Sequence, residues 1–189
     1  MTFVAEPDPT HQVQAVYDAD VQDRGYVMNL SRVWAHQPEA HDDLFALIAD
    51  VARVGGLSVR ERGILVTACA STLGDSYCSL AWGSKLAAES DPDLAAGVLL
   101  GADTGLSEAE RAMASWARRV AADPNGTTAA DVESLRAAGL EDGRVVAVTL
   151  FVALRLAFST VNDALGAVPD AELWATAPAA VADAVTWGR

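Results

Sequence analysis

Apolar residues recur at helical spacing along most of the chain and predict a protein built from helices. In residues 42–54, four apolar positions share one helix face that ends at the Gly55-Gly56 pair: Leu44, Leu47, Ile48 and Val51. Residues 59–73 are apolar on every side, which is typical of a helix that is buried all round. Residues 145–158 form the longest apolar stretch, which Arg155 interrupts, and they predict another buried helix.

Capping residues mark where several of these helices begin. Ser58 and Glu61 have the spacing of a capping box, in which each side chain accepts from the backbone N–H of the other residue. Ser107 and Glu110 repeat this pattern. Periodicity and turn residues predict the remaining helices over 12–22, 29–34, 76–89, 92–100, 108–120, 128–138, 142–165 and a short tail ending near Trp187.

No segment alternates apolar and polar residues as a strand would, so we expect an all-α fold. With 189 residues, 51% of them hydrophobic and 21% charged, the composition is that of one globular domain. We expect a single helical domain over residues 1–189, with an N-terminal arm (1–27), a core (28–169) and a C-terminal tail helix (170–189).

The formal net charge of -13 argues against a nucleic-acid partner, because binding a polyanion requires clustered Lys and Arg. The N-terminus has no basic or apolar run of a secretory signal, and the 145–158 stretch is shorter than the ~20 residues that span a bilayer. Two cysteines are too few for a disulfide scaffold. These features predict a cytoplasmic protein that does not enter a membrane.

Cys78 is the first candidate for chemistry. If Asp75 caps the helix over 76–89, Cys78 is its third residue, where free N–H groups and the helix dipole lower a thiol pKa. The negative charge of Asp75 acts in the opposite direction. The alternative is that Cys78 is a small apolar residue packed between two helices.

Cys69 lies on the all-apolar helix, where an inert core thiol is the simplest interpretation. Cys69 and Cys78 are equally far from the turn at Leu73-Gly74, so an antiparallel hairpin would place them at one level. A disulfide would still require Cα atoms within ~7 Å, closer than helix axes usually pack.

The other titratable residues form no recognisable motif. His36 and His41 flank a turn, and no histidine pair has the spacing of a metal site, so we expect no metal and no cofactor. Glu61 could relay protons, although the capping box explains its presence. We expect any pocket to lie near Cys78, Trp82 and Glu61, with His36 as a neighbour.

The segment GGLSVRERGILVTACASTLGDSYCSLAWGSKL, together with the blocks on either side of it, resembles the alkylhydroperoxidase D-like and carboxymuconolactone decarboxylase family. The resemblance covers about Gly25 to Pro169. It implies an all-helical fold and a homo-oligomer.

The family's redox members use a Cys-x-x-Cys motif, a histidine four residues beyond it and a glutamate on the preceding helix. The resemblance places the second cysteine at Cys78, the first at Asp75, the histidine at Trp82 and the glutamate at Gly63. Three of the four positions therefore lack the required chemistry. A dithiol cycle needs a second thiol in reach, and only Cys69 could supply one.

Three functions remain open at this point. The first is an antioxidant, peroxidase-related protein by descent that has little or no dithiol peroxidase activity. The second is a lyase or isomerase that acts on a small organic acid, with Arg60, Arg62 or His36 as its candidate groups. The third is a non-catalytic ligand-binding oligomer. Whichever function holds, the apolar tail with Trp174 and Trp187 predicts a homo-oligomer, because such tails are typical of interfaces.

Overall fold

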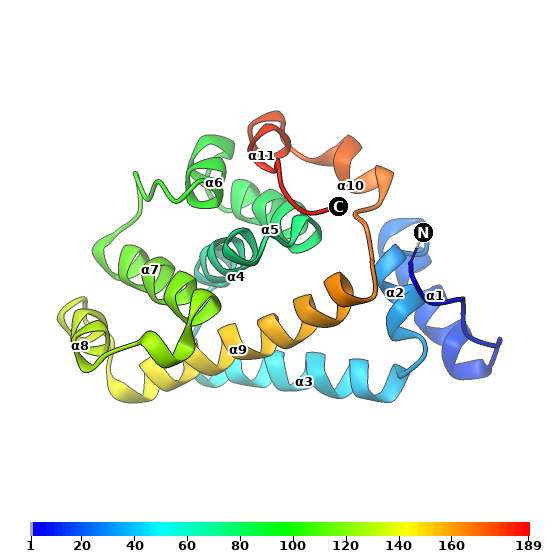
Figure 1. Cartoon of the computed structure of the whole chain (residues 1–189), viewed down its shortest axis with the longest axis horizontal. Coiled ribbons are helices and arrows are strands. Elements are labelled where there is room, and N and C mark those ends of the chain that lie inside the picture. The colour runs from blue at the N-terminus through cyan, green and yellow to red at the C-terminus, as the bar shows by residue number, and fades with distance from the viewer. Residues whose placement is uncertain (1) are drawn as a thin grey trace.

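The computed structural model describes residues 2–189, which contain eleven α-helices and one 3₁₀ turn and no strand (Figure 1). The helices are α1 (His11–Arg24), α2 (Asn29–Trp34), α3 (Pro38–Val54), α4 (Val59–Leu73), α5 (Ser76–Ala88), α6 (Pro92–Leu99), α7 (Glu108–Ala122), α8 (Ala129–Ala137), α9 (Asp142–Ala164), α10 (Ala171–Thr176) and α11 (Ala179–Ala184), with the 3₁₀ turn at Pro124–Gly126. The all-α prediction is confirmed.

Helices α4 and α5 begin at the capping residues that the sequence predicted. The Ser58 backbone N–H donates to Glu61 Oε2 at 2.9 Å, and Glu61 N–H donates to Ser58 Oγ at 3.1 Å. Asp75 caps α5 by accepting from the Cys78 N–H at 2.9 Å. Each such cap satisfies donors that a helix start would otherwise leave unpaired.

The all-apolar helix α4 lies at the centre of the molecule, as its pattern predicted. Every residue from 63 to 70 is buried, and α4 packs against α5, α6, α7 and α9. The α4–α5 hairpin turns at Gly74, whose φ of 74° suits glycine. This turn places Cys78 at the start of a helix that is itself packed on the core.

Two predicted boundaries were wrong. Helix α3 begins at Pro38, ahead of residue 42, because proline is well tolerated in the first turn of a helix. The tail forms two short helices, α10 and α11, and Trp187 follows them outside any helix. Pro178 separates the two helices, since its ring and missing N–H end a regular helix.

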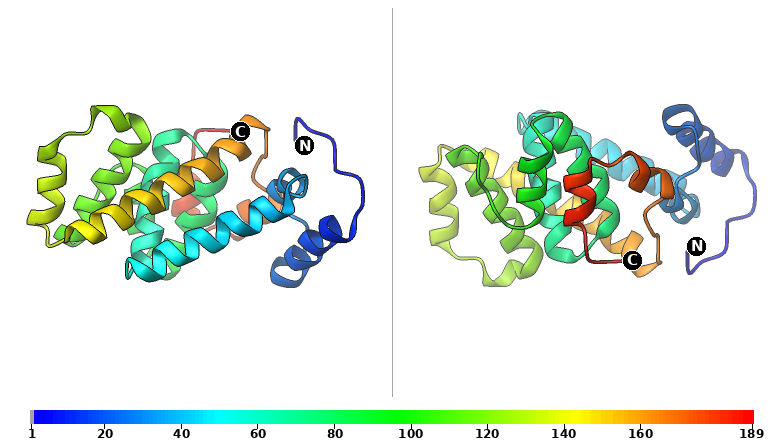
Figure 2. Two further views of the ribbon diagram at one scale, coloured as in Figure 1. Left: turned by 90° about the horizontal axis from the view of Figure 1, so that it is seen from below. Right: turned by 90° about the horizontal axis from the view of Figure 1, so that it is seen from above.

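Helices α3 and α9 run antiparallel along one side of the molecule, and Figure 2 (left) shows no other helix over their outer surface. Helix α9 is long and apolar enough to cross a membrane by length and composition, and 44% of its most apolar window is buried in the molecule. Helix α9 packs against α3, α4 and α7. The prediction that residues 145–158 form a buried helix holds for the face that meets these helices, whereas Val146 and Leu150 on another face are exposed.

Candidate functional site

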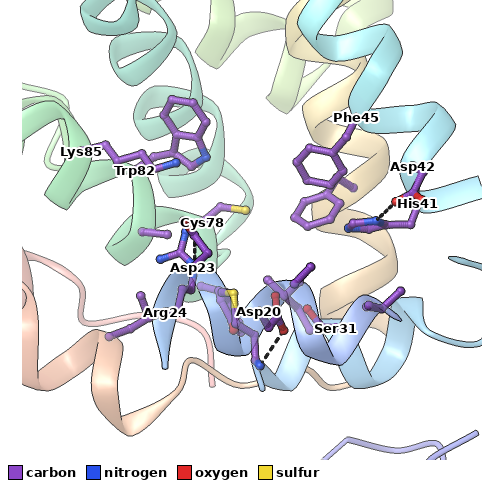
Figure 3. A pocket seen from close by; sticks show the side chains of 18 of the residues that line it. Asp20, Asp23, Arg24, Ser31, His41, Asp42, Phe45, Cys78, Trp82 and Lys85 are labelled. Carbon is purple, nitrogen blue, oxygen red and sulfur yellow. Dashed lines mark hydrogen bonds and ion pairs between the residues drawn. The ribbon is translucent and has the colours of Figure 1, made fainter. Parts of the chain in front are cut away.

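A cavity of about 670 Å³ lies between α1, α2, α3, α5 and α9, with α10 at its edge. Figure 3 shows Trp82 and Lys85 of α5 on one side of this cavity and His41 and Phe45 of α3 on the other. Its size falls within the about 300–1,000 Å³ that is typical of small-molecule sites. The walls are mainly apolar, with a few polar groups among them.

Cys78 lines this cavity, although its exposed fraction is only 2%. Its sulfur lies 3.4 Å from Arg155 Nη2 and 3.5 Å from Ser159 Oγ, both on α9, and both groups can donate to it. Burial raises the pKa of the Cys78 thiol well above its ordinary value, and the negative charge of Asp75 raises it further. Arg155 and Ser159 lower this pKa only in part, so the resting group is a neutral thiol.

Arg155 also lies on the cavity wall beside Cys78, and its exposed fraction is 3%. Its guanidinium carbon lies 5.3 Å from the ring centroid of Trp82 and 4.9 Å from that of Phe158. Such cation–π contacts partly replace the water that a buried guanidinium loses. Its Nε atom is buried and has no hydrogen-bond partner among the described residues.

Asp75 is the residue that caps α5, three positions before Cys78, and it is fully buried. One carboxylate oxygen caps α5, whereas the other, Oδ2, has no hydrogen-bond partner within residues 2–189. Burial and the charge of Asp75 raise the pKa of neighbouring Asp163 to about 6, with Arg189 opposing the shift. The position that the family resemblance assigns to a first cysteine therefore holds a buried carboxylate, which cannot form a disulfide.

The structure brings Cys78 and Trp82 together on the cavity wall, but Glu61 and His36 do not line this cavity. Glu61 caps α4 and pairs with Arg144 at 2.6 Å. His36 is exposed, with its Nε2 atom 2.9 Å from the carbonyl oxygen of Ala5, and it borders a separate cavity of about 350 Å³. The prediction that these two residues share a pocket with Cys78 was wrong, because both lie on other surfaces.

Cys69 and Gly63 both belong to the packed core of α4. Cys69 and Cys78 are free thiols, and Cys69 Sγ donates to the carbonyl oxygen of Val66 at 3.4 Å instead of lining the cavity. Burial raises the pKa of Cys69 to about 12. Gly63 lies against Leu86 of α5, so its missing side chain allows α4 and α5 to approach closely.

Three residues around the cavity were not identified from the sequence: Arg155, Ser159 and His41. The signal for Arg155 was present, since it is the one charge within the apolar 145–158 stretch, but it appeared only as an interruption. A charge on the apolar face of a helix indicates a buried polar site as readily as a break. Within the part of the chain that the structure describes, no group of three or more His, Cys, Asp or Glu could hold a metal ion.

No protein-family model matches the chain, and no curated protein matches it in sequence. Solved structures match it in fold. An uncharacterized peroxidase-related protein from Ralstonia eutropha JMP134, described as an alkylhydroperoxidase AhpD core, has a TM-score of 0.77 and 23% identity, and the match covers 91% of this chain and 94% of that one. A peroxidase-related protein from Silicibacter sp. TM1040 has a TM-score of 0.79 and 23% identity, with 91% and 93% covered.

The debrominase Bmp8 in its apo form also matches, with a TM-score of 0.67, 13% identity and coverage of 93% of this chain and 92% of that one. A cysteine-to-alanine variant of Bmp8 in complex with 2,3,4-tribromopyrrole has a TM-score of 0.70 and 16% identity, with 93% and 91% covered. These likenesses show that the chain has the alkylhydroperoxidase D-like helical fold, as its sequence predicted.

Proposed function

Since the chain has the alkylhydroperoxidase D-like fold, we propose that it is a peroxidase-related protein that has lost dithiol peroxidase activity. We propose further that it retains the cavity at Cys78 as a site for a small organic molecule. One observation carries this proposal. Cys78 is the only thiol among the described residues that line the cavity, and a buried carboxylate, Asp75, precedes it on the same turn.

The chemistry of the site opposes a thiol peroxidase cycle at two steps. The first step needs a thiolate, and burial together with Asp75 raises the pKa of Cys78 well above its ordinary value. The second step needs a thiol that attacks the resulting sulfenic acid, and Asp75 has no sulfur. Trp82 occupies the position of the proton-transferring histidine and cannot transfer a proton at neutral pH.

We therefore expect negligible hydroperoxide consumption by the protein in the presence of a dithiol reductant. Proton transfer alone contributes about 10²–10⁴-fold to catalysis, so turnover should lie at least two orders of magnitude below that of a dithiol enzyme. The measurement is peroxide loss over time, with Cys78→Ser and Cys69→Ser as the comparison variants. Robust turnover that Cys78→Ser abolishes would contradict the proposal, and its loss in Cys69→Ser as well would identify Cys69 as the resolving thiol.

The walls of the cavity support an aromatic ligand. Trp82, Phe45 and Phe158 all contribute rings to the region around Cys78, and Phe45 meets Phe158 edge-on at 5.1 Å between centroids. A protein of the same fold, the debrominase Bmp8, binds a brominated pyrrole. The lyase alternative gains no support from its original candidates, because Arg60 pairs with Glu110 and neither Arg60 nor Arg62 lines the cavity.

We also propose that the protein forms a homo-oligomer in the cytoplasm. Of the two tail residues that the sequence suggested for the interface, Trp174 is 40% exposed and remains available. Trp187 donates to Ser79 Oγ at 3.4 Å and packs within its own chain, so it is not available for an interface. The outer face of α3 and α9 also exposes four large apolar side chains: Leu47, Val54, Val146 and Leu150. The two free thiols agree with a reducing compartment.

Val146→Glu should convert this oligomer into a monomer, because the side chain is 64% exposed and a glutamate would place a charge in the buried contact. Light scattering at micromolar concentration gives the mass directly. Leu100→Glu, at a residue that is 65% exposed outside this face, is the matched control and should leave the mass unchanged. A mass of 19.7 kDa for the unmodified protein would overturn the proposal.

A further inference from the structure

A buried carboxylate, Asp75, lies close enough to affect the same thiol, Cys78, but Arg155 itself is a buried cation that no carboxylate contacts directly among the described residues. It forms no ion pair with any carboxylate in residues 2–189, although ten ion pairs occur elsewhere in that range. Its one hydrogen bond within that range is to a neutral sulfur, that of Cys78, and its Nε has no partner. Burying an unpaired charge is strongly unfavourable, so a side chain in this state on a cavity wall is a candidate for binding an anionic ligand.

The acidic groups that line the cavity are already engaged. Asp42 lies 3.1 Å from His41 Nδ1, and Glu39 accepts from the Gln12 side chain at 2.9 Å. The two acidic residues of α1 are engaged in the same way: Asp20 accepts from the Met28 N–H at 2.9 Å, and Asp23 lies 3.5 Å from Arg24. None of them approaches Arg155 closely enough to pair with it.

Positive charge instead gathers around Trp82. Lys85 lies over the Trp82 ring at 4.7 Å and forms no ion pair in residues 2–189, while Arg155 lies 5.3 Å from the same ring. Partial burial lowers the pKa of Lys85, and the nearby charges of Arg24 and Arg155 lower it further. The end of the cavity formed by α5 and α9 therefore presents two cations that form no direct ion pair among the described residues, although Asp23 lies close enough to Lys85 to raise its pKa.

The surroundings of Arg155 define what kind of anion would fit. The rings of Trp82 and Phe158 contact the guanidinium, which leaves its edge as the place for hydrogen bonds. Nη2 donates to the Cys78 sulfur, and Nε is buried away from the cavity. A planar carboxylate can accept from two guanidinium nitrogens at once, and here these are the terminal nitrogens Nη1 and Nη2. Because the Cys78 thiol is neutral, it does not repel such an anion.

We propose that the cavity binds an aromatic carboxylate, with its carboxylate group on the terminal nitrogens of the Arg155 guanidinium beside Cys78 and its ring among Trp82, Phe45 and Phe158. This inference rests on the proposed use of the cavity as a small-molecule site and names the ligand class. Lys85 supplies a second, more exposed positive charge at the same end. Arg155 acts here as the binding residue that selects charged ligands over neutral ones.

The test is calorimetric titration with 2-naphthoate and with 2-naphthamide, which share a ring system and differ in charge. Because hydrogen bonds to a charged group are stronger than neutral ones, the unmodified protein should bind the acid about 10- to 100-fold more tightly than the amide. In Arg155→Met this preference should disappear. Arg53→Met, which removes an exposed arginine of α3 that does not line the cavity, should keep the full preference.

Arg155→Lys provides a second variant if the methionine variant does not fold, as judged by circular dichroism. Lysine retains the positive charge but lacks the planar guanidinium edge. The preference of this variant for the acid over the amide should therefore fall well below that of the unmodified protein. Equal affinity of the unmodified protein for acid and amide would overturn this inference and leave the small-molecule site intact. Failure of both probes to bind would overturn the small-molecule site as well. An unchanged preference in Arg155→Met would show that another group selects the charge.

Discussion

Gly63→Glu should leave the protein unable to fold stably. Gly63 is buried where α4 crosses α5, and a Cβ atom placed there would lie 3.2 Å from Leu86 Cβ and 3.4 Å from its Cα. The rest of a glutamate side chain would have to enter this contact. It would also bring an unpaired carboxylate into the core. We expect a loss of about 4 kcal/mol or more in the free energy of unfolding.

Urea denaturation followed by circular dichroism measures this loss, with Gly63→Ala as the matched control. Alanine adds only the Cβ atom, which α5 can accommodate by a shift of a few tenths of an ångström, so its effect should stay below about 2 kcal/mol. A glutamate variant that unfolds at the same urea concentration as the unmodified protein would show that the α4–α5 contact is loose.

This contact bears on any attempt to introduce dithiol chemistry at the cavity. The resemblance assigns the proton-relay glutamate to residue 63, and Asp75→Cys with Trp82→His would restore the other two positions. The close approach of α4 and α5 at Gly63 leaves little room for that side chain. Of the three substitutions, we therefore expect Gly63→Glu to be the one that the fold tolerates least.

The sequence predicted those features that depend on neighbours along the chain. The capping boxes at Ser58 and Ser107 follow from spacings of three residues, and both form as expected. The burial of residues 63–70 of α4 follows from their almost wholly apolar composition, and the position of Cys78 as third residue of α5 follows from the Asp75 cap. Local rules were sufficient in each case, because both partners lie within one helical turn.

The composition of the cavity could not be predicted in this way. Arg155 and Cys78 are 77 residues apart, and no periodicity in either segment indicates that α9 passes the start of α5. Trp34 donates to Asn162 across a separation of 128 residues. Glu61 and His36 were assigned to the wrong surface for the same reason, since their neighbours in space depend on how the helices pack.

Asp170→Ala should destabilise the protein by about 3 kcal/mol, because a single buried carboxylate holds three segments together. Asp170 is 5% exposed and accepts from the hydroxyl of Tyr77 on α5 and, at 2.9 Å, from the backbone N–H of Asn29 at the start of α2. Burial and the hydrogen bond to Asp170 raise the pKa of Tyr77 well above its ordinary value, so its hydroxyl remains a donor. Alanine would leave the buried Tyr77 hydroxyl and the half-buried Asn29 N–H without this acceptor.

Urea unfolding of a double-mutant cycle with Tyr77→Phe tests whether this network acts as a unit. Tyr77→Phe alone should lose about 1–2 kcal/mol, and the double variant should lose less than the sum, because each change removes the same hydrogen bond. Asp43→Ala, at an exposed position of α3, should change stability by no more than about 0.5 kcal/mol. Strict additivity would show that Tyr77 and Asp170 contribute independently. Since Tyr77 also lines the cavity, non-additivity would link the stability of the C-terminal segment to the shape of the site at Cys78.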